Sequence, residues 1–592
     1  MASFTFAGDA VTRYFSIPRF LPIVLLLAAV ACPQVFGQAS ESAADHFPST
    51  TAIYVHVEKP AELIDTIENH PVVKKVLALK QVQDLIASPQ VAMALLGRAF
   101  VETQIGQTVQ EALKENTEKG LSFGIDTESD GVILVFQARE EDRLKKVAGI
   151  LLKLVQQNAE GEGKDPPFKR VDYRDAVAAK FDDFLVARYK NWFAITNKPK
   201  LGKAFVDNLI DGTDSPLSKQ KWFKDASAKR GDADVWAAVD MNAIRKIADD
   251  GEAFSGRTDN PGVELVFGGV LDALKNSPVA FAELNVDEQI DVAVSAPFNA
   301  DWATEAREFF FGKKLGGLAP KALAPNNLIA NLTSHRDLGL WWLSKEELYA
   351  ENVIAELTQA DSQLSTIFSG MNFGEDVLGA LEPGVQIVVT ENCYDEDYIP
   401  DVKVPAFALV GRLKDAKRMQ RKLKIAFQSV VGFVNINLGM TGQPQLDLET
   451  EKIGDTKVLA ASYFYEEGTE EGLLLFNFTP TIAFRDSDLI LASNRDLAIE
   501  LAELTANQKP EAAEDVNTKL NIKGETLHRI LEANSESLIA QNMLEEGNDR
   551  KAASQQIELL LTAAKFLRGL DVNYRVGDHE MKFDMALSFE VD

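Results

Sequence analysis

The chain has 592 residues, 46% hydrophobic and 25% charged, which is long enough to bury several cores. Its formal net charge is −28 at pH 7 and its pI is near 4.8, which opposes binding to nucleic-acid phosphates. The sequence has no basic run with interleaved aromatic side chains, so we expect no nucleic-acid partner.

The N-terminus has the pattern of an export signal. Arg13 and Arg19 precede the apolar stretch LPIVLLLAAVA (Leu21–Ala31), whose length suits a signal sequence and is short for a membrane span. Gly37 is small enough for the last position before a signal-peptidase cut, so residues 1–37 are predicted to be a signal peptide. We expect the mature protein to be periplasmic or associated with the cell envelope, with no further transmembrane segment.

The two cysteines add one alternative to this prediction. Cys32, in the string AVAC, is a possible site of lipidation that would anchor the chain. Cleavage at residue 37 leaves Cys393 as the only thiol, so no intramolecular disulfide can form. A catalytic thiol needs a positively charged neighbourhood, whereas Cys393 is flanked by Glu391 and Asp395.

Two stretches of the chain read alike at an offset of 285 residues. STTAIYVHVEKPAELI (49–64) and SHRDLGLWWLSKEELY (334–349) both alternate apolar and polar residues before an apparent helix start. The alternation predicts a strand through Leu338, Leu340 and Trp342.

The second stretch also contains the tetrad His-Arg-Asp-Leu that opens a protein-kinase catalytic loop. A kinase needs Asn four residues beyond the Leu, where Trp342 stands, and an Asp-Phe-Gly triplet, which here is Asn372-Phe373-Gly374. The sequence also has no glycine-rich loop or strand lysine at kinase spacing before the tetrad. We therefore exclude a kinase.

Four further pairs of segments match in the same order at similar offsets. Each pair shares a pattern of strand and helix: 133–155 with 407–431, 193–198 with 490–495, 239–247 with 522–530, and the hairpins 279–298 with 569–590. Within the modules, strands come as adjacent pairs joined by turn residues, as in LSFGI-DTESDG-VILVF (121–136).

These matches predict an α+β protein of two tandem duplicated modules, each a mostly antiparallel sheet with helices packed on one face. The alternative is two unrelated α+β domains with generic patterns. The predicted first module spans 45–311 and the second 328–592, joined by the Gly/Pro/Ala-rich connector 312–327.

Two acidic stretches are candidate cation sites. DTESDG (126–131) begins like a calcium loop but has Gln137 where a bidentate Glu is needed, so it is predicted to be a hairpin turn. The run YDEDYIPD (394–401) offers oxygen ligands but lacks the glycine turn. The metal candidates are Asp395, Asp397 and Asp401.

The signal pattern, the segment EKPAEL (Glu58–Leu63) and the later strand-helix unit ending in KDAKRM (Lys414–Met419) resemble large exported bacterial proteins that carry domains of unknown function. The resemblance covers nearly the whole mature chain as a pattern of elements. It implies an envelope setting and transfers no catalytic residue to this sequence.

Three functional hypotheses remain open at this point. The first is an exported, non-enzymatic protein with a binding or scaffold role toward a protein or envelope partner. The second is a carrier that holds an apolar ligand or lipid between sheet and helices, which a large apolar cavity would favour. The third is a hydrolase whose site is assembled from distant residues. No catalytic residue and no cofactor are predicted.

Overall fold

The computed structural model describes residues 42–590, apart from 162–164, 248–256, 369, 395–397, 464–471, 509–512 and scattered positions between 80 and 118. The predicted signal peptide, Cys32, Asp395 and Asp397 lie outside the described residues. The chain divides into two compact units. Unit 1 takes Met1–Ala253 and Ser277–Pro297, and unit 2 takes Phe254–Asn276 and Phe298–Asp592.

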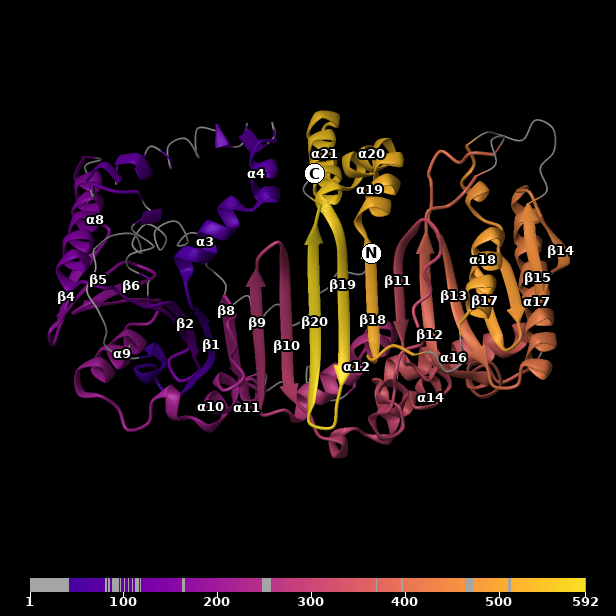
Figure 1. Ribbon diagram of the computed structural model, residues 1–592, viewed down its shortest axis with the longest axis horizontal. Helices are drawn as coiled ribbons and strands as arrows, with labels where there is room; N and C mark the ends of the chain where they lie inside the picture. Colours follow the sequence, from indigo (N-terminus) through magenta and orange to yellow (C-terminus); the bar gives the residue numbers. More distant parts are fainter. Residues whose placement is uncertain are drawn as a thin grey trace. The chain divides into compact units, whose positions relative to one another are not determined.

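Unit 1 is built from short antiparallel strands and a set of helices (Figure 1). Its strands are β1 (Thr51–Val57), β2 (Leu121–Asp126), β3 (Gly131–Gln137), β4 (Lys169–Tyr173), β5 (Ala176–Lys180), β6 (Leu185–Tyr189), β7 (Trp192–Thr196), β8 (Val235–Asp240), β9 (Val279–Val286) and β10 (Gln289–Pro297). Its helices include α3 (Pro60–Asn69), α4 (Pro71–Leu77), α8 (Glu141–Gly161), α9 (Pro199–Asp211), α10 (Lys221–Ser227) and α11 (Met241–Ile247).

The strands of unit 1 pair in the order β10-β9-β8-β1-β2-β3-β7-β6-β5-β4, and each of these pairings is antiparallel. The turn 126–131 joins β2 to β3, as predicted, and the Asp126 carboxylate accepts hydrogen bonds from Ser129 within it. It is a hairpin turn rather than a calcium loop.

Unit 2 has the same kinds of elements as unit 1. Its strands are β11 (Leu328–Ser334), β12 (Leu381–Thr390), β13 (Ala406–Leu413), β14 (Leu446–Ile453), β15 (Thr456–Tyr463), β16 (Thr481–Arg485), β17 (Asp488–Ala492), β18 (Thr518–Lys523), β19 (Leu567–Val576) and β20 (Glu580–Phe589). Its helices include α12 (Pro261–Asn276), α13 (Glu308–Phe311), α14 (Leu338–Leu343), α15 (Lys345–Leu348), α16 (Glu351–Ile367), α17 (Ala416–Thr441), α18 (Arg495–Ala506), α19 (Gly524–Ala533), α20 (Ser535–Glu546) and α21 (Arg550–Phe566).

The strands of unit 2 pair in the order β20-β19-β18-β11-β12-β13-β17-β16-β15-β14, again antiparallel throughout. This order repeats that of unit 1 strand for strand. In Figure 1, α19, α20 and α21 gather at one end of β18–β20, and α14 and α16 lie toward the opposite end of the unit 2 strands. The predicted α+β class with antiparallel strands is confirmed.

The prediction of helices on one face only is wrong, because both faces of the sheet are covered at the β3–β7 side of unit 1. Ile133 and Val135 pack with α9 and α10, whereas Phe136, the next residue along the strand, packs with α8. Unit 2 repeats this arrangement, with α18 on one face and α17 on the other. Strands covered on both faces are apolar at successive positions, and all five residues of β7 are buried.

The strand predicted through Leu338, Leu340 and Trp342 is also wrong, since these residues form helix α14. The strand, β11, ends at Ser334, and the Asp337 side chain caps the helix by accepting a hydrogen bond from the Leu340 N–H at 2.9 Å. The kinase-like tetrad is therefore a turn from a strand into a capped helix.

Helix α12 is held in unit 2 by two buried arginines. The Arg336 Nε donates to the Leu265 carbonyl at 2.7 Å, its Nη1 donates to Asn517 Oδ1 at 3.0 Å, and its guanidinium lies 3.6 Å from the centre of the Phe310 ring. Burial lowers the pKa of Arg336 to about 9, so it stays charged at neutral pH.

The second arginine, Arg307, forms buried ion pairs on the same helix. Its Nε lies 3.2 Å from Glu264 and its Nη1 lies 4.0 Å from Asp272, and none of the three side chains is more than 7% exposed. A side chain at Gly269, which lies between Glu264 and Asp272 on the same helix, would collide with Phe310, so glycine is required there for the close approach. Residues 257–276 and 298–311, which the predicted boundaries gave to the first module, thus pack within unit 2.

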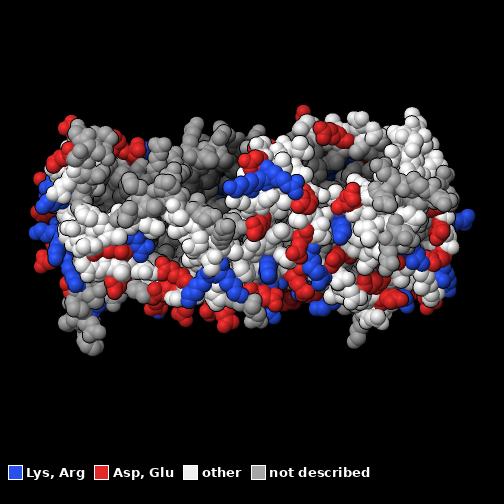
Figure 2. Space-filling model, turned by 90° about the horizontal axis from the view of Figure 1, so that it is seen from above, with Lys and Arg blue, Asp and Glu red and all other residues white. Residues whose placement is uncertain are grey.

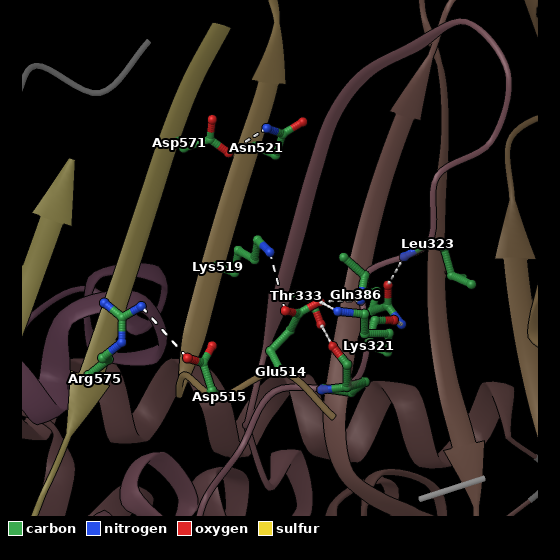
Figure 3. A network of polar contacts seen from close by, with 12 residues as sticks. Lys321, Leu323, Thr333, Gln386, Glu514, Asp515, Lys519, Asn521, Asp571 and Arg575 are labelled. Carbon is green, nitrogen blue, oxygen red and sulfur yellow. Dashed lines mark hydrogen bonds and ion pairs between the residues drawn. The ribbon is translucent and has the colours of Figure 1, made fainter. Parts of the chain in front are cut away.

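The predicted connector 312–327 is ordered against the sheet of unit 2 (Figure 3). Glu514 accepts hydrogen bonds from the Ala322 N–H at 3.0 Å and from Lys519 at 3.2 Å, and Gln386 binds the Leu323 N–H at 3.0 Å. Burial alone would raise the pKa of Glu514, but these hydrogen bonds and the neighbouring Lys321 lower it overall.

Replacing Arg307 should destabilise unit 2. In Arg307→Met, Glu264 would be left buried without a countercharge and Asp272 would keep only the neighbouring Lys275, at a cost of about 3–5 kcal/mol in the free energy of unfolding. Urea unfolding of the two proteins measures the difference. The control is Arg550→Met, whose ion pair with Glu536 is exposed and should contribute little. Equal midpoints for the two variants would contradict this account.

Candidate functional site

The described residues of unit 1 form a pocket of about 550 Å³, partly open to solvent, between helix α8 and strands β4–β7. Most of its lining is apolar. The apolar lining residues are Ala148, Leu152 and Val155 of α8, Pro167, Val177, Ala178, Ala179, Phe181, Val186, Ala187 and Phe193, together with Gly149. A pocket of this size and polarity is typical of sites for small apolar ligands.

Three cations complete the lining, and none of the fifteen lining residues is acidic. They are Lys145 on α8, Arg170 on β4 and Arg188 on β6. Arg188 lies 3.6 Å from Glu141, whose side chain is largely exposed. The pocket therefore combines an apolar interior with positive charge, which suits a ligand with an apolar body and an anionic end.

Unit 2 has a pocket in the equivalent place, of about 480 Å³, between α17 and β14–β16. The hairpins β4–β5 and β14–β15 have equal two-residue loops, so strand register places Ala179 and Leu459 at equivalent positions. Register likewise matches Arg188 with Phe484. An offset of 275 between the helices matches Gly149 with Lys424. All of these residues line one pocket or the other.

Small side chains explain why the unit 1 pocket is open and apolar. Ala179 and Ala148 stand where unit 2 has Leu459 and Leu423, and smaller side chains leave space that the backbone does not close. A Cβ added at Gly149 would meet no other atom within 4 Å, so α8 presents open space there. Sequence reasoning matched the two helices but missed the pocket, because it did not compare side-chain sizes at the matched positions.

The predicted acidic metal candidates are not brought together by the described residues. Asp395 and Asp397 lie outside those residues, and Asp401 is exposed, with its N–H bound to the Gly472 carbonyl at 3.1 Å. Among the described residues, no group of three His, Cys, Asp or Glu side chains could hold a metal ion. Cys393 is a free, exposed thiol beside Glu391, in a polar pocket that also contains Glu500.

One serine-histidine contact bears on the hydrolase hypothesis. Ser122 Oγ lies 2.8 Å from His56 Nδ1, and His56 Nε2 lies 3.5 Å from Glu58, which resembles a triad in outline. However, Ser122 is only 1% exposed and shares a second hydrogen bond, of 2.9 Å, with the Tyr54 hydroxyl. A nucleophile must reach its substrate, so this cross-strand contact of β1 and β2 is structural.

Comparison with known proteins gives little further information. No protein family and no curated protein matches the sequence. Among solved structures, crystal forms I, III and IV of TP0453 are similar, with 8% sequence identity and TM-scores of 0.23–0.24. These matches cover 44% of this chain and 80–81% of that one. At such values the likeness supports no conclusion about fold or function.

The buried His56 should make unit 1 sensitive to acid. Burial lowers the pKa of His56 to about 4, although Glu58 raises it in part. Between about pH 6.5 and 4 the unfolded chain binds a proton that the folded chain does not, so the free energy of unfolding falls as pH falls, by up to about 3 kcal/mol. Urea unfolding from pH 7 to pH 4 measures this slope.

A variant separates this effect from the other titrating groups. His335 in unit 2, whose pKa burial also lowers to about 4, contributes a slope of its own. His56→Gln should remove the part of the pH dependence that is due to His56 and leave the part that is due to His335. A profile of His56→Gln identical to that of the unsubstituted protein would refute the assignment.

Proposed function

We propose that this chain is an exported, non-enzymatic binding protein that carries an amphipathic ligand in the pocket of unit 1. The ligand class is an acyl-like apolar body with an anionic end. The observation that carries the proposal is the apolar pocket of about 550 Å³ under α8, whose charged lining residues, within the part of the chain that the structure describes, are Lys145, Arg170 and Arg188. This choice favours the carrier hypothesis over a scaffold, because a scaffold role does not require an internal pocket.

The two units are best explained, in our proposal, by internal duplication of one ancestral module. The matching strand order and the equivalent pockets support this view. Four of the five sequence matches fall on elements with equivalent places in that order, whereas the match of 49–64 with 334–349 does not. In this view the residues that line the two pockets diverged after the duplication. Those of unit 1 became mainly apolar, and those of unit 2 became mainly cationic.

Export and an envelope location form part of the same proposal. They rest on the sequence of residues 1–37, with lipidation of Cys32 as the alternative. A carrier of amphipathic molecules has an evident use in a compartment bounded by membranes.

Filling the pocket should abolish ligand binding without harming the fold. In Gly149→Leu the new side chain enters open space, and replacing a glycine inside a helix adds about 0.5–1 kcal/mol of stability. We expect palmitate to bind to the unsubstituted protein, as measured by calorimetry and native mass spectrometry, and at least ten-fold more weakly to the variant. The matched control is Gly432→Leu on α17, where a Cβ also meets no atom within 4 Å.

Either of two outcomes would end the carrier proposal. One is the absence of palmitate binding to protein that has been extracted to remove endogenous ligand. The other is equal palmitate affinity for Gly149→Leu and Gly432→Leu, which would place the bound molecule elsewhere.

Removing a pocket cation should weaken only ligands with an anionic end. Arg170→Met keeps an apolar side chain of similar length but lacks the charge, so palmitate affinity should fall several-fold. The affinity for hexadecanol, which has the same chain and no charge, should change little. Competition against a fluorescent fatty acid measures both. Equal losses for the two ligands would show that Arg170 acts through packing rather than charge.

A further inference from the structure

Helix α17 divides into a basic segment and an uncharged segment. Its first nine residues, AKRMQRKLK (416–424), carry five cations and no carboxylate. The remaining seventeen, 425–441, contain no charged residue. On the face shown in Figure 2, by contrast, Lys and Arg side chains are interspersed with Asp and Glu. The whole chain has a net charge of −28, so the positive charge of the basic segment is opposite in sign to that of the protein as a whole.

The uncharged segment exposes large apolar side chains to solvent. Phe433 is 62% exposed, Ile436 63% and Met440 80%. Their spacing of three and four residues places them on one face of the helix, and Arg418 and Lys422 of the basic segment follow on that face at helical spacing. Three large apolar side chains this exposed in one row form a patch of the kind that marks an interaction surface.

The basic segment also lines the unit 2 pocket, where further cations come from the sheet. Lys417, Arg421 and Lys424 face Lys452 and Lys457 across it. The hydrogen-bond partners of Lys424 and Lys457 are neutral, Thr450 at 3.4 Å and Gln420 at 3.1 Å. The single carboxylate in the lining, Glu451, is bound by Arg495 of α18 at 2.6 Å. Lys452 lies 3.9 Å from the exposed Asp455, outside the lining. Lys417, Arg421, Lys424 and Lys457 still give the pocket an excess of positive charge that an anion can neutralise.

We propose that α17 docks unit 2 on an anionic lipid bilayer. The basic segment and the unit 2 pocket bind phosphate headgroups, and Phe433, Ile436 and Met440 insert among the acyl chains. A helix with a cationic segment and an apolar face is the type that binds at the interface of anionic membranes. This inference stands independently of the ligand proposed for unit 1.

The packing of α17 favours a position on the membrane surface over a span across it. By length and composition α17 is the one helix among the described residues that could cross a membrane. However, Met419, Leu423 and Val431 are buried in the core of unit 2, so one side of the helix is already occupied. The exposed row is the side left for lipid.

A second copy of the chain fits this surface less well than a bilayer does. In a twofold dimer through α17, the basic segment of one copy would face either the same segment or the apolar row of its partner. Neither supplies the negative charge that five cations require. A bilayer containing anionic lipid supplies both the charge and an apolar phase.

Vesicle sedimentation with the full mature chain tests the proposal. Vesicles of phosphatidylcholine mixed with phosphatidylglycerol should bind the protein at least ten-fold more tightly than vesicles of phosphatidylcholine alone. The triple variant Phe433→Ser, Ile436→Ser, Met440→Ser should lose binding to both. The double variant Arg421→Gln, Lys424→Gln should lose only the preference for phosphatidylglycerol. These side chains are at the surface or line an open pocket, so the fold should be retained, which circular dichroism checks.

The control is Leu544→Ser on α20, where the leucine is 86% exposed and lies outside α17. Binding by this variant should match that of the unsubstituted protein. The proposal is overturned if neither vesicle binds, if the α17 variants bind as well as the control, or if light scattering shows a dimer that only the triple variant dissolves.

Discussion

The buried side chain of Arg336 holds several segments of unit 2 together. With 3% of its surface exposed, it donates hydrogen bonds to a carbonyl of α12 and to Asn517 just before β18, and it lies against Phe310 of α13. A buried guanidinium needs every donor satisfied, so four distant segments must meet around it. The groups that accept hydrogen bonds from Arg336 are neutral. The buried ion pairs on α12 are formed by Arg307 with Glu264 and Asp272. The boundary between the units follows from this, because α12 is fixed in unit 2 while β8 and β9 on either side of it belong to unit 1.

The two units have the same strand order but different pockets. Both units place a long helix across the outer hairpins, and the pocket volume is set by what stands at a few equivalent positions. Alanine and glycine in unit 1 leave an apolar space, whereas lysine and phenylalanine in unit 2 give a smaller, cationic one. The backbone supplies the site and the side chains decide its chemistry, which is the general relation between a fold and its functions.

Local patterns predicted much of the fold, since hairpins and amphipathic helices are specified by neighbouring residues. The turn 126–131 and the helices α8 and α17 are examples. Prediction failed where the deciding partner is distant in sequence or the signal is one side chain. Asp337 converts an alternating stretch into the capped helix α14, and no local pattern shows that α12 belongs with Arg307 and Arg336. The pocket under α8 depends on side-chain volumes across four strands. Only a comparison of Ala179 with Leu459, and of similar pairs, would have indicated it.

The placement of α12 also orders events during synthesis. The helix ends at Asn276, and the arginines that bind it, Arg307 and Arg336, are made about 30 and about 60 residues later, so α12 cannot dock in this way until both exist. Unit 1 is complete by Pro297, before either arginine is made. Until then Glu264 and Asp272 can stay hydrated, and they need a countercharge only once α12 is buried against Arg307. The order of synthesis thus places both arginines after the helix that they bind.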